Sequence, residues 1–121
     1  MKFDRAQAVR IGKRLNEASG YLELGMAQHA LDCLEGLGNL GPFEAPVEML
    51  RGEALRIQQH YEAAAHLLER AARKFPRPHD RRAWMALSLC YRQAGDTDRA
   101  IQSLACARGA RLPKPGPRPR L

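Results

Sequence analysis

The sequence predicts an all-α protein, an α-solenoid of three helix–turn–helix repeats with a short C-terminal tail. Three observations predict it. Ala, Leu and Arg are abundant in the 121 residues while aromatic residues make up only 6%, which favours helix. A pattern of small and apolar residues recurs about every thirty-four residues. Within each copy the pattern has helical spacing, with a glycine or a proline where each helix should end.

Seven positions define the repeat. The first copy contains Ala18, Tyr21, Gly25, Ala30, Leu34, Leu37 and Pro42. The second copy contains Gly52, Leu55, Gln59, Ala64, Leu68, Ala71 and Pro76. The third copy contains Ser88, Tyr91, Gly95, Ala100, Leu104, Ala107 and, one place late, Pro113. Only Gln59 departs outright from the chemistry of its column. The third copy is offset by two extra residues, which fall in the segment 77–80, between helices.

The first repeat is predicted to contain helices over 4–24 and 26–39. The small Ala18 and Ala30 let the two helices approach closely, and Tyr21 and Leu34 fill the volume around that contact. Gly25 can adopt the left-handed conformation that ends the first helix. A proline, Pro42, follows the second helix and stops it.

The second and third repeats follow the same plan, with helices over 44–59, 61–74, 80–94 and 96–109. Gly95 ends one of these helices and Asp96 can cap the next. The turn of the second repeat has weaker support, because Gln58 and Gln59 stand where its neighbours have glycine. One domain is expected over 1–110, with repeats at about 11–44, 45–78 and 81–113. The tail, 111–121, is rich in Pro and Arg, which favours an extended conformation.

The third copy resembles the tetratricopeptide repeat. The residues that carry the resemblance are Trp84, Leu87, Ser88, Tyr91, Gly95, Ala100, Leu104 and Ala107. The first two copies have Arg14 and Glu48 in place of the Trp, and Glu17 and Arg51 where a Leu is usual. The resemblance covers about 11–113. It implies a protein-interaction scaffold and not an enzyme. Many such arrays end in an extra capping helix, so the outer face of 96–109 is expected to be covered by the tail, a second copy or a partner.

The resemblance also implies a concave groove lined by the first helix of each repeat. The groove positions are Leu15, Ser19, Leu22, Glu23, Met49, Glu53, Arg56, Ile57, Arg82, Met85, Leu89 and Arg92. The last four lie on one helical stripe, separate from the stripe of Trp84, Leu87 and Tyr91 that packs inside the repeat. Packing between neighbouring helices is the alternative explanation of the second stripe. A clamp for a chaperone's C-terminal carboxylate is not expected, because only Arg82 of the corresponding residues is basic.

Charge is unevenly distributed along the chain, whose net charge is +7. Residues 1–69 hold seven Lys/Arg against ten Asp/Glu, whereas 70–121 hold thirteen against three. A basic half of this kind is typical of a solvated surface with a basic tail, and the alternative is a binding surface for an acidic protein, an anionic membrane or nucleic acid. Few aromatic residues accompany the basic ones, which disfavours nucleic acid. Self-assembly through the last repeat is a further alternative, and a small chaperone of secreted substrates fits this basic chain badly.

Neither catalysis nor a cofactor is expected. His29 and Cys33 are one helical turn apart but have no further ligands nearby, so no metal site is expected, and His60 and His66 lie on different faces. The three cysteines, Cys33, Cys90 and Cys106, lack C-x-x-C spacing and are expected to be buried thiols in a reduced compartment. No apolar run is long enough to span a membrane and no secretory signal is visible, so a cytoplasmic location is expected.

Overall fold

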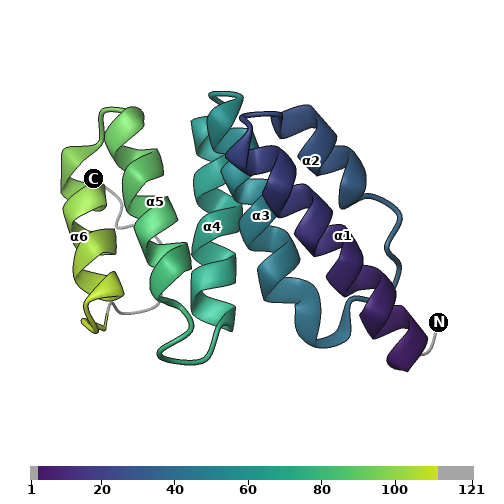
Figure 1. Cartoon of the computed structure of the whole chain (residues 1–121). Coiled ribbons are helices and arrows are strands. Elements are labelled where there is room, and N and C mark those ends of the chain that lie inside the picture. Colours follow the sequence, from purple (N-terminus) through teal and green to yellow (C-terminus); the bar gives the residue numbers. More distant parts are fainter. Residues whose placement is uncertain (1–2, 112–121) are drawn as a thin grey trace, which may run out of the picture.

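Six α-helices and one short 3-10 helix make up the computed structural model, which describes residues 3–111 (Figure 1). The α-helices are α1 (Arg5–Glu23), α2 (Ala27–Cys33), α3 (Glu44–Ile57), α4 (Tyr61–Lys74), α5 (Arg81–Gln93) and α6 (Thr97–Ala107). The 3-10 helix η1 (Gly41–Phe43) leads directly into α3. Strands are absent from the described part of the chain. The predicted all-α class is confirmed. Most predicted helix ends agree with the structure within two residues.

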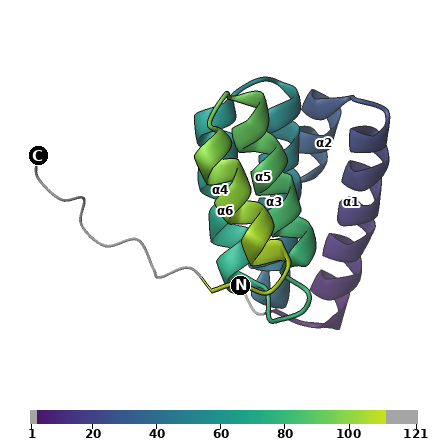
Figure 2. The ribbon, with the colours of Figure 1, turned by 90° about the vertical axis from the view of Figure 1, so that its left-hand side faces the viewer.

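Each helix packs mainly against the helices before and after it in the chain. Figures 1 and 2 show the resulting row of antiparallel helices, which begins with α1 and α2 and ends with α6. The core follows this row as one continuous band in which Leu34, Leu68 and Leu87 are almost completely buried. An α-solenoid, as predicted, is therefore the architecture of residues 3–111.

Small residues set the distance between the two helices of a repeat. A Cβ atom added to Gly52 would lie 2.7 Å from Cγ of Leu68 and 3.3 Å from the carbonyl oxygen of Ala64. In the third repeat the corresponding residue is Ser88, whose hydroxyl donates a hydrogen bond of 2.7 Å to the carbonyl of Ala100. The predicted close approach is confirmed, and the second repeat has no room even for one methyl group.

All three repeats turn between their helices in the same way. One residue of each turn has a positive φ: 73° at Gly25, 66° at Gln59 and 87° at Gly95. The amide of the next residue then donates a hydrogen bond of 2.8–2.9 Å back to the carbonyl of Tyr21, Leu55 or Tyr91, the pattern of a Schellman motif. The turn of the second repeat is thus built like its neighbours, but with a glutamine in the left-handed conformation.

The second helix differs from its prediction. It was expected over 26–39, but α2 ends at Cys33 because Gly36 and Gly38 adopt positive φ values of 66° and 73°. Pro42 therefore does not stop this helix, and it lies in η1 at the start of the next repeat. The loop between α2 and η1 is held by Gln7 of α1, whose buried side-chain amide donates to the carbonyls of Leu37 and Asn39. Of the predicted tail over 111–121, residues 112–121, including Pro113, lie outside the described residues.

Candidate functional site

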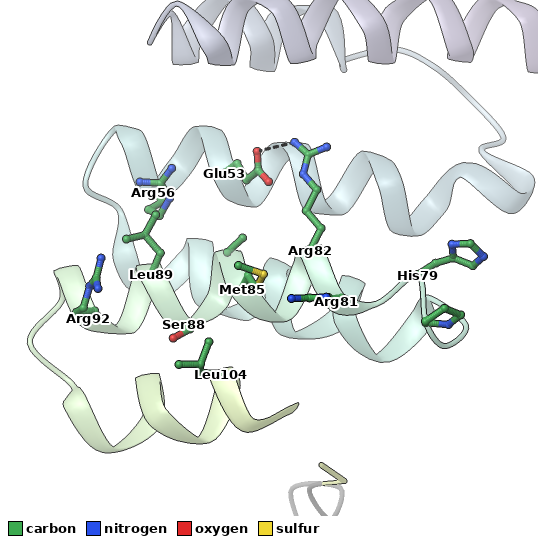
Figure 3. A pocket seen from close by; sticks show the side chains of 12 residues that line it. Glu53, Arg56, His79, Arg81, Arg82, Met85, Ser88, Leu89, Arg92 and Leu104 are labelled. Atoms are coloured by element: carbon green, nitrogen blue, oxygen red, sulfur yellow. Dashed lines mark hydrogen bonds and ion pairs between the residues drawn. The ribbon is translucent and has the colours of Figure 1, made fainter. Parts of the chain in front are cut away.

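A pocket of about 740 Å³ opens between α3 and α5 (Figure 3). We call it the groove pocket. It is lined by Glu53, Arg56, Pro78, His79, Arg81, Arg82, Met85, Ala86, Ser88, Leu89, Arg92 and Leu104. Most of the lining comes from α5, with α3 on one side and α6 and the α4–α5 loop supplying the rest.

Apolar side chains form the middle of the groove pocket. Met85 is 47% exposed and Leu104 is 36% exposed, although both are large hydrophobic residues. Leu89 lies one turn along α5 from Met85 and is half-buried. A methionine here adds a flexible and polarisable contact surface. The centre of the pocket therefore offers an apolar surface to a ligand.

Cations surround this apolar centre. Figure 3 shows Arg56 and Arg92 at one end of the pocket, with Arg81 and Arg82 toward the other. The guanidinium of Arg82 lies 3.4 Å from the carboxylate of Glu53, the one acidic residue in the lining. Four arginines against one glutamate give the pocket a positive charge, so it favours a ligand that carries carboxylates.

Two of the arginines and one buried donor lack partners in the pocket. Within residues 3–111, Arg81 and Arg92 form no ion pair or side-chain hydrogen bond. Arg56 donates one hydrogen bond of 3.1 Å to Gln93, but its buried Nε–H has no acceptor among the described residues. A buried donor without an acceptor is energetically costly.

The first turn of α5 adds to the attraction for anions. Arg81 and Arg82 occupy this turn, which contains no acidic residue. Cations at a helix N-terminus oppose the helix dipole by roughly 0.3–1 kcal/mol each at exposed sites. The carboxylate of Asp80, the N-cap residue of α5, already offsets part of this repulsion, and the guanidinium of Arg81 is available to an anion in the pocket.

A family comparison identifies the repeats. The model of the tetratricopeptide repeat family matches residues 49–112, slightly more than half of the chain. The chain belongs to the tetratricopeptide repeat family. This family generally mediates protein–protein interaction and generally acts as a scaffold without catalysis. A search of the curated proteins finds no match.

The matched tetratricopeptide repeats differ at their Trp position. Trp84 of the third repeat is buried, donates a 3.1 Å hydrogen bond to Asp80, and lies 5.6 Å from the guanidinium of Arg73. Its counterpart in the second repeat is Glu48, a buried carboxylate bound by Lys74 at 2.8 Å and by Arg70. An ion cluster thus occupies the position that holds a packed aromatic ring in the third repeat.

The groove pocket brings together six of the residues that the resemblance placed in a concave groove. These are Glu53, Arg56, Arg82, Met85, Leu89 and Arg92. The others lie elsewhere. Met49 is buried in the core, and Leu15, Leu22 and Ile57 pack against it, while Ser19 is half-buried and Glu23 is exposed on α1.

Sequence reasoning missed six of the twelve lining residues, among them Leu104 and Ser88. Both were assigned to packing inside the repeat. Leu104 is equivalent to Leu34 and Leu68 of the other repeats, and Ser88 is equivalent to Ala18 and Gly52. Leu104 lines the groove pocket and is partly exposed, because no described element packs over this side of α6. The signal that could have identified it was its place in the last repeat.

Much of the basic excess of the C-terminal half is compensated locally. Arg73 pairs with Glu69 at 3.3 Å, and Arg77 donates hydrogen bonds of 2.8 and 3.1 Å to the carbonyls of Gly109 and Ala110. Because of these contacts and the ion pairs of Glu48, several of the basic side chains already have partners within the protein. Two arginines of α5, Arg81 and Arg92, form no ion pair in the described part of the chain, and both line the groove pocket.

The remaining candidate groups have structural surroundings. All three cysteines are buried as free thiols, as predicted. Burial raises the pKa of the Cys90 thiol, and burial together with the carboxylate of Glu17 raises the pKa of Cys33. No cluster of three potential metal ligands occurs among residues 3–111. Likewise, none of the helices in this part of the chain combines the length and apolarity needed to cross a bilayer.

Proposed function

We propose that the protein binds a segment of a partner protein in the groove pocket. Apolar side chains of that segment would contact Met85 and Leu89, and acidic side chains beside them would pair with the arginines at either end. The observation that carries this proposal is the exposed apolar centre enclosed by four arginines in a pocket of about 740 Å³.

The two kinds of contact have different roles. Burial of Met85 and the apolar side chain that meets it removes hydrocarbon from water and slows dissociation. The arginines mainly increase the rate of encounter and select acidic segments over basic ones. Arg92 has no intramolecular partner in the described structure, so a carboxylate that binds it has no existing ion pair to displace.

The test combines partner capture with two variants in the full chain. Met85→Asp places a carboxylate in the apolar centre, and Arg92→Glu reverses a charge at its end; both side chains are exposed, so the fold should survive. Lys13→Glu is the matched control, because Lys13 is an exposed cation on α1, outside the pocket. Partners captured from the native host are identified by mass spectrometry, and their affinity for each variant is then measured with purified components.

We expect Met85→Asp and Arg92→Glu each to weaken binding by about tenfold or more, equivalent to about 1.4 kcal/mol. Lys13→Glu should leave binding within about twofold. If correctly folded Met85→Asp and Arg92→Glu bind like the unmodified protein, the groove pocket is not the site. A ligand that proves to be nucleic acid would be recognised by an affinity that falls steeply with salt, with a log–log slope near about −0.9 per phosphate contact.

A further inference from the structure

The outward face of α6 is apolar and uncovered, unlike the same face of α4. Ile101 is 61% exposed, whereas its counterpart Ala65 is 9% exposed. The difference arises because α5 packs on α4, while α6 stands at the end of the row of described helices (Figure 1).

Four residues form the centre of this outward face. Asp98, Ile101, Ala105 and Arg108 follow one another at i, i+3, i+7 and i+10, which places them on one stripe of the helix. The stripe lies opposite Ala100, Ser103 and Cys106, which are buried toward α5. We call it the α6 stripe. Its order is acid, large apolar, small apolar, base.

The two charged ends of the α6 stripe are unused. Neither Asp98 nor Arg108 forms an ion pair in the described part of the chain, although Asp96 and Arg99 next to them pair at 3.5 Å. The stripe therefore presents an unpaired acid at one end and an unpaired base at the other, with an exposed apolar centre between them.

We propose that the α6 stripe binds the α6 stripe of a second copy, with the two helices antiparallel about a two-fold axis. In that arrangement, residues at equal distances on either side of position 103 face each other. Asp98 of one copy then faces Arg108 of the other, and Ile101 faces Ala105. Each pair occurs twice, because a two-fold interface is self-complementary. The large Ile101 meets the small Ala105, so the helices can approach closely.

Charge and polarity favour this occupant over a head-to-tail stack. In such a stack, α1 of a second copy would cover α6 as α5 covers α4. The positions of α5 that serve this purpose include Ala83 and Cys90, which are completely buried. Their counterparts in α1 are the exposed Lys13 and Gly20, so at these two positions α1 offers a cation and no side chain; Val9 is the exposed apolar residue of this face. The α6 stripe itself carries one acid and one base, so two copies of it attract each other.

The first experiment measures molar mass by sedimentation and light scattering. It uses the full chain from about 5 to about 500 µM, because one helix pair is a small interface and should associate weakly. The salt concentration is kept at about 0.15 M to screen the repulsion between two basic molecules. We expect a concentration-dependent dimer for the unmodified protein and a monomer for Ile101→Asp. Val9→Asp is the matched control, because Val9 is 66% exposed on α1 and lies outside the stripe.

Two further sets of variants test the orientation. Asp98→Arg should weaken the dimer at least tenfold, and adding Arg108→Asp should restore it, because the exchanged charges again face each other. A chain with Asp98→Cys and Arg108→Cys should form a disulfide-linked dimer on oxidation. Within one chain the two positions are about 15 Å apart, too far for a bond. Asp98→Cys alone should cross-link poorly, and the native cysteines, being buried, should give little background.

The possible results separate the proposal from its alternatives. An unmodified protein that stays monomeric throughout this range overturns it, as does a dimer that is unaffected by Ile101→Asp. Equal cross-linking by the single Asp98→Cys variant overturns the antiparallel arrangement. The groove pocket can fail its own test without affecting these measurements, because its test variants, Met85→Asp and Arg92→Glu, lie on α5 and leave the α6 stripe intact.

Discussion

The left-handed glutamine in the second repeat makes a quantitative prediction. Gln59 has a φ of 66°, while the equivalent residues of the other repeats are the glycines Gly25 and Gly95. A side chain in this conformation brings Cβ too close to the following carbonyl oxygen. We predict that Gln59→Gly stabilises the protein, although substitution by glycine usually lowers protein stability.

Two opposing terms set the magnitude. The left-handed conformation costs an L-residue about 1–2 kcal/mol. Glycine gives back part of this gain, because it loses about 0.5–1 kcal/mol more in conformational entropy on folding. Gln59 is exposed and makes no side-chain hydrogen bond within the described residues, so no contact is sacrificed. The net expectation is a gain of about 0.5–1 kcal/mol, or a rise in Tm of about 2–4 °C.

Urea unfolding followed by circular dichroism measures the change. Ala94→Gly is the matched control: Ala94 caps α5 at the turn position just before the glycine, with an ordinary φ of −79°. There the substitution gains no relief of strain and should cost about 0.5–1 kcal/mol. The reasoning is refuted if Gln59→Gly lowers the free energy of unfolding as Ala94→Gly does.

Three further predictions concern packing, capping and thiol reactivity. Gly52→Ala should destabilise the protein by about 1–3 kcal/mol, because the added Cβ would overlap Leu68. Gly20→Ala on α1 meets open space and should stabilise the protein by up to about 1 kcal/mol. Urea unfolding compares the two variants. Asp96→Ala removes the side-chain acceptor of α6 and should lower stability by about 1 kcal/mol in thermal unfolding, whereas Asp96→Asn should retain most of it. Burial raises the pKa of the Cys90 thiol, so its alkylation should be slow in the native protein. Alkylation at about pH 8, followed by mass spectrometry, should be about tenfold faster in urea. Equal rates would contradict the buried position of Cys90.

Local chemistry explains why most of the fold was predictable. The small residues, the turn glycines Gly25 and Gly95 and the cap at Asp96 each act over a few residues, so the sequence alone reveals them. The early end of α2 depends instead on a long-range contact. Gly36 and Gly38 allow the chain to leave the helix, but the loop is held by Gln7, about thirty residues away, and no local pattern announces that partner.

Periodicity shows which residues share a helix face, but not which of those faces remain open. It placed Met49 and Met85 in equivalent positions, yet Met49 is buried while Met85 is exposed in the groove pocket. The buried Nε–H of Arg56 without an acceptor is likewise visible only in three dimensions. The groove remains a prediction for its first-repeat residues, of which Leu15 and Leu22 pack against the core.

The loop tethered by Gln7 has a consequence for how the array comes apart. Seven residues make up α2, too few for a helix to persist by itself, and its loop keeps its shape only while α1 is docked. Detachment of α1 would therefore loosen the first repeat, whereas the α3–α4 pair has its own close packing between Gly52 and Leu68. Native-state hydrogen–deuterium exchange should show amides of α2 opening at a fraction of the global cost, while those of α4 exchange last. We therefore expect the first repeat to unfold before the second.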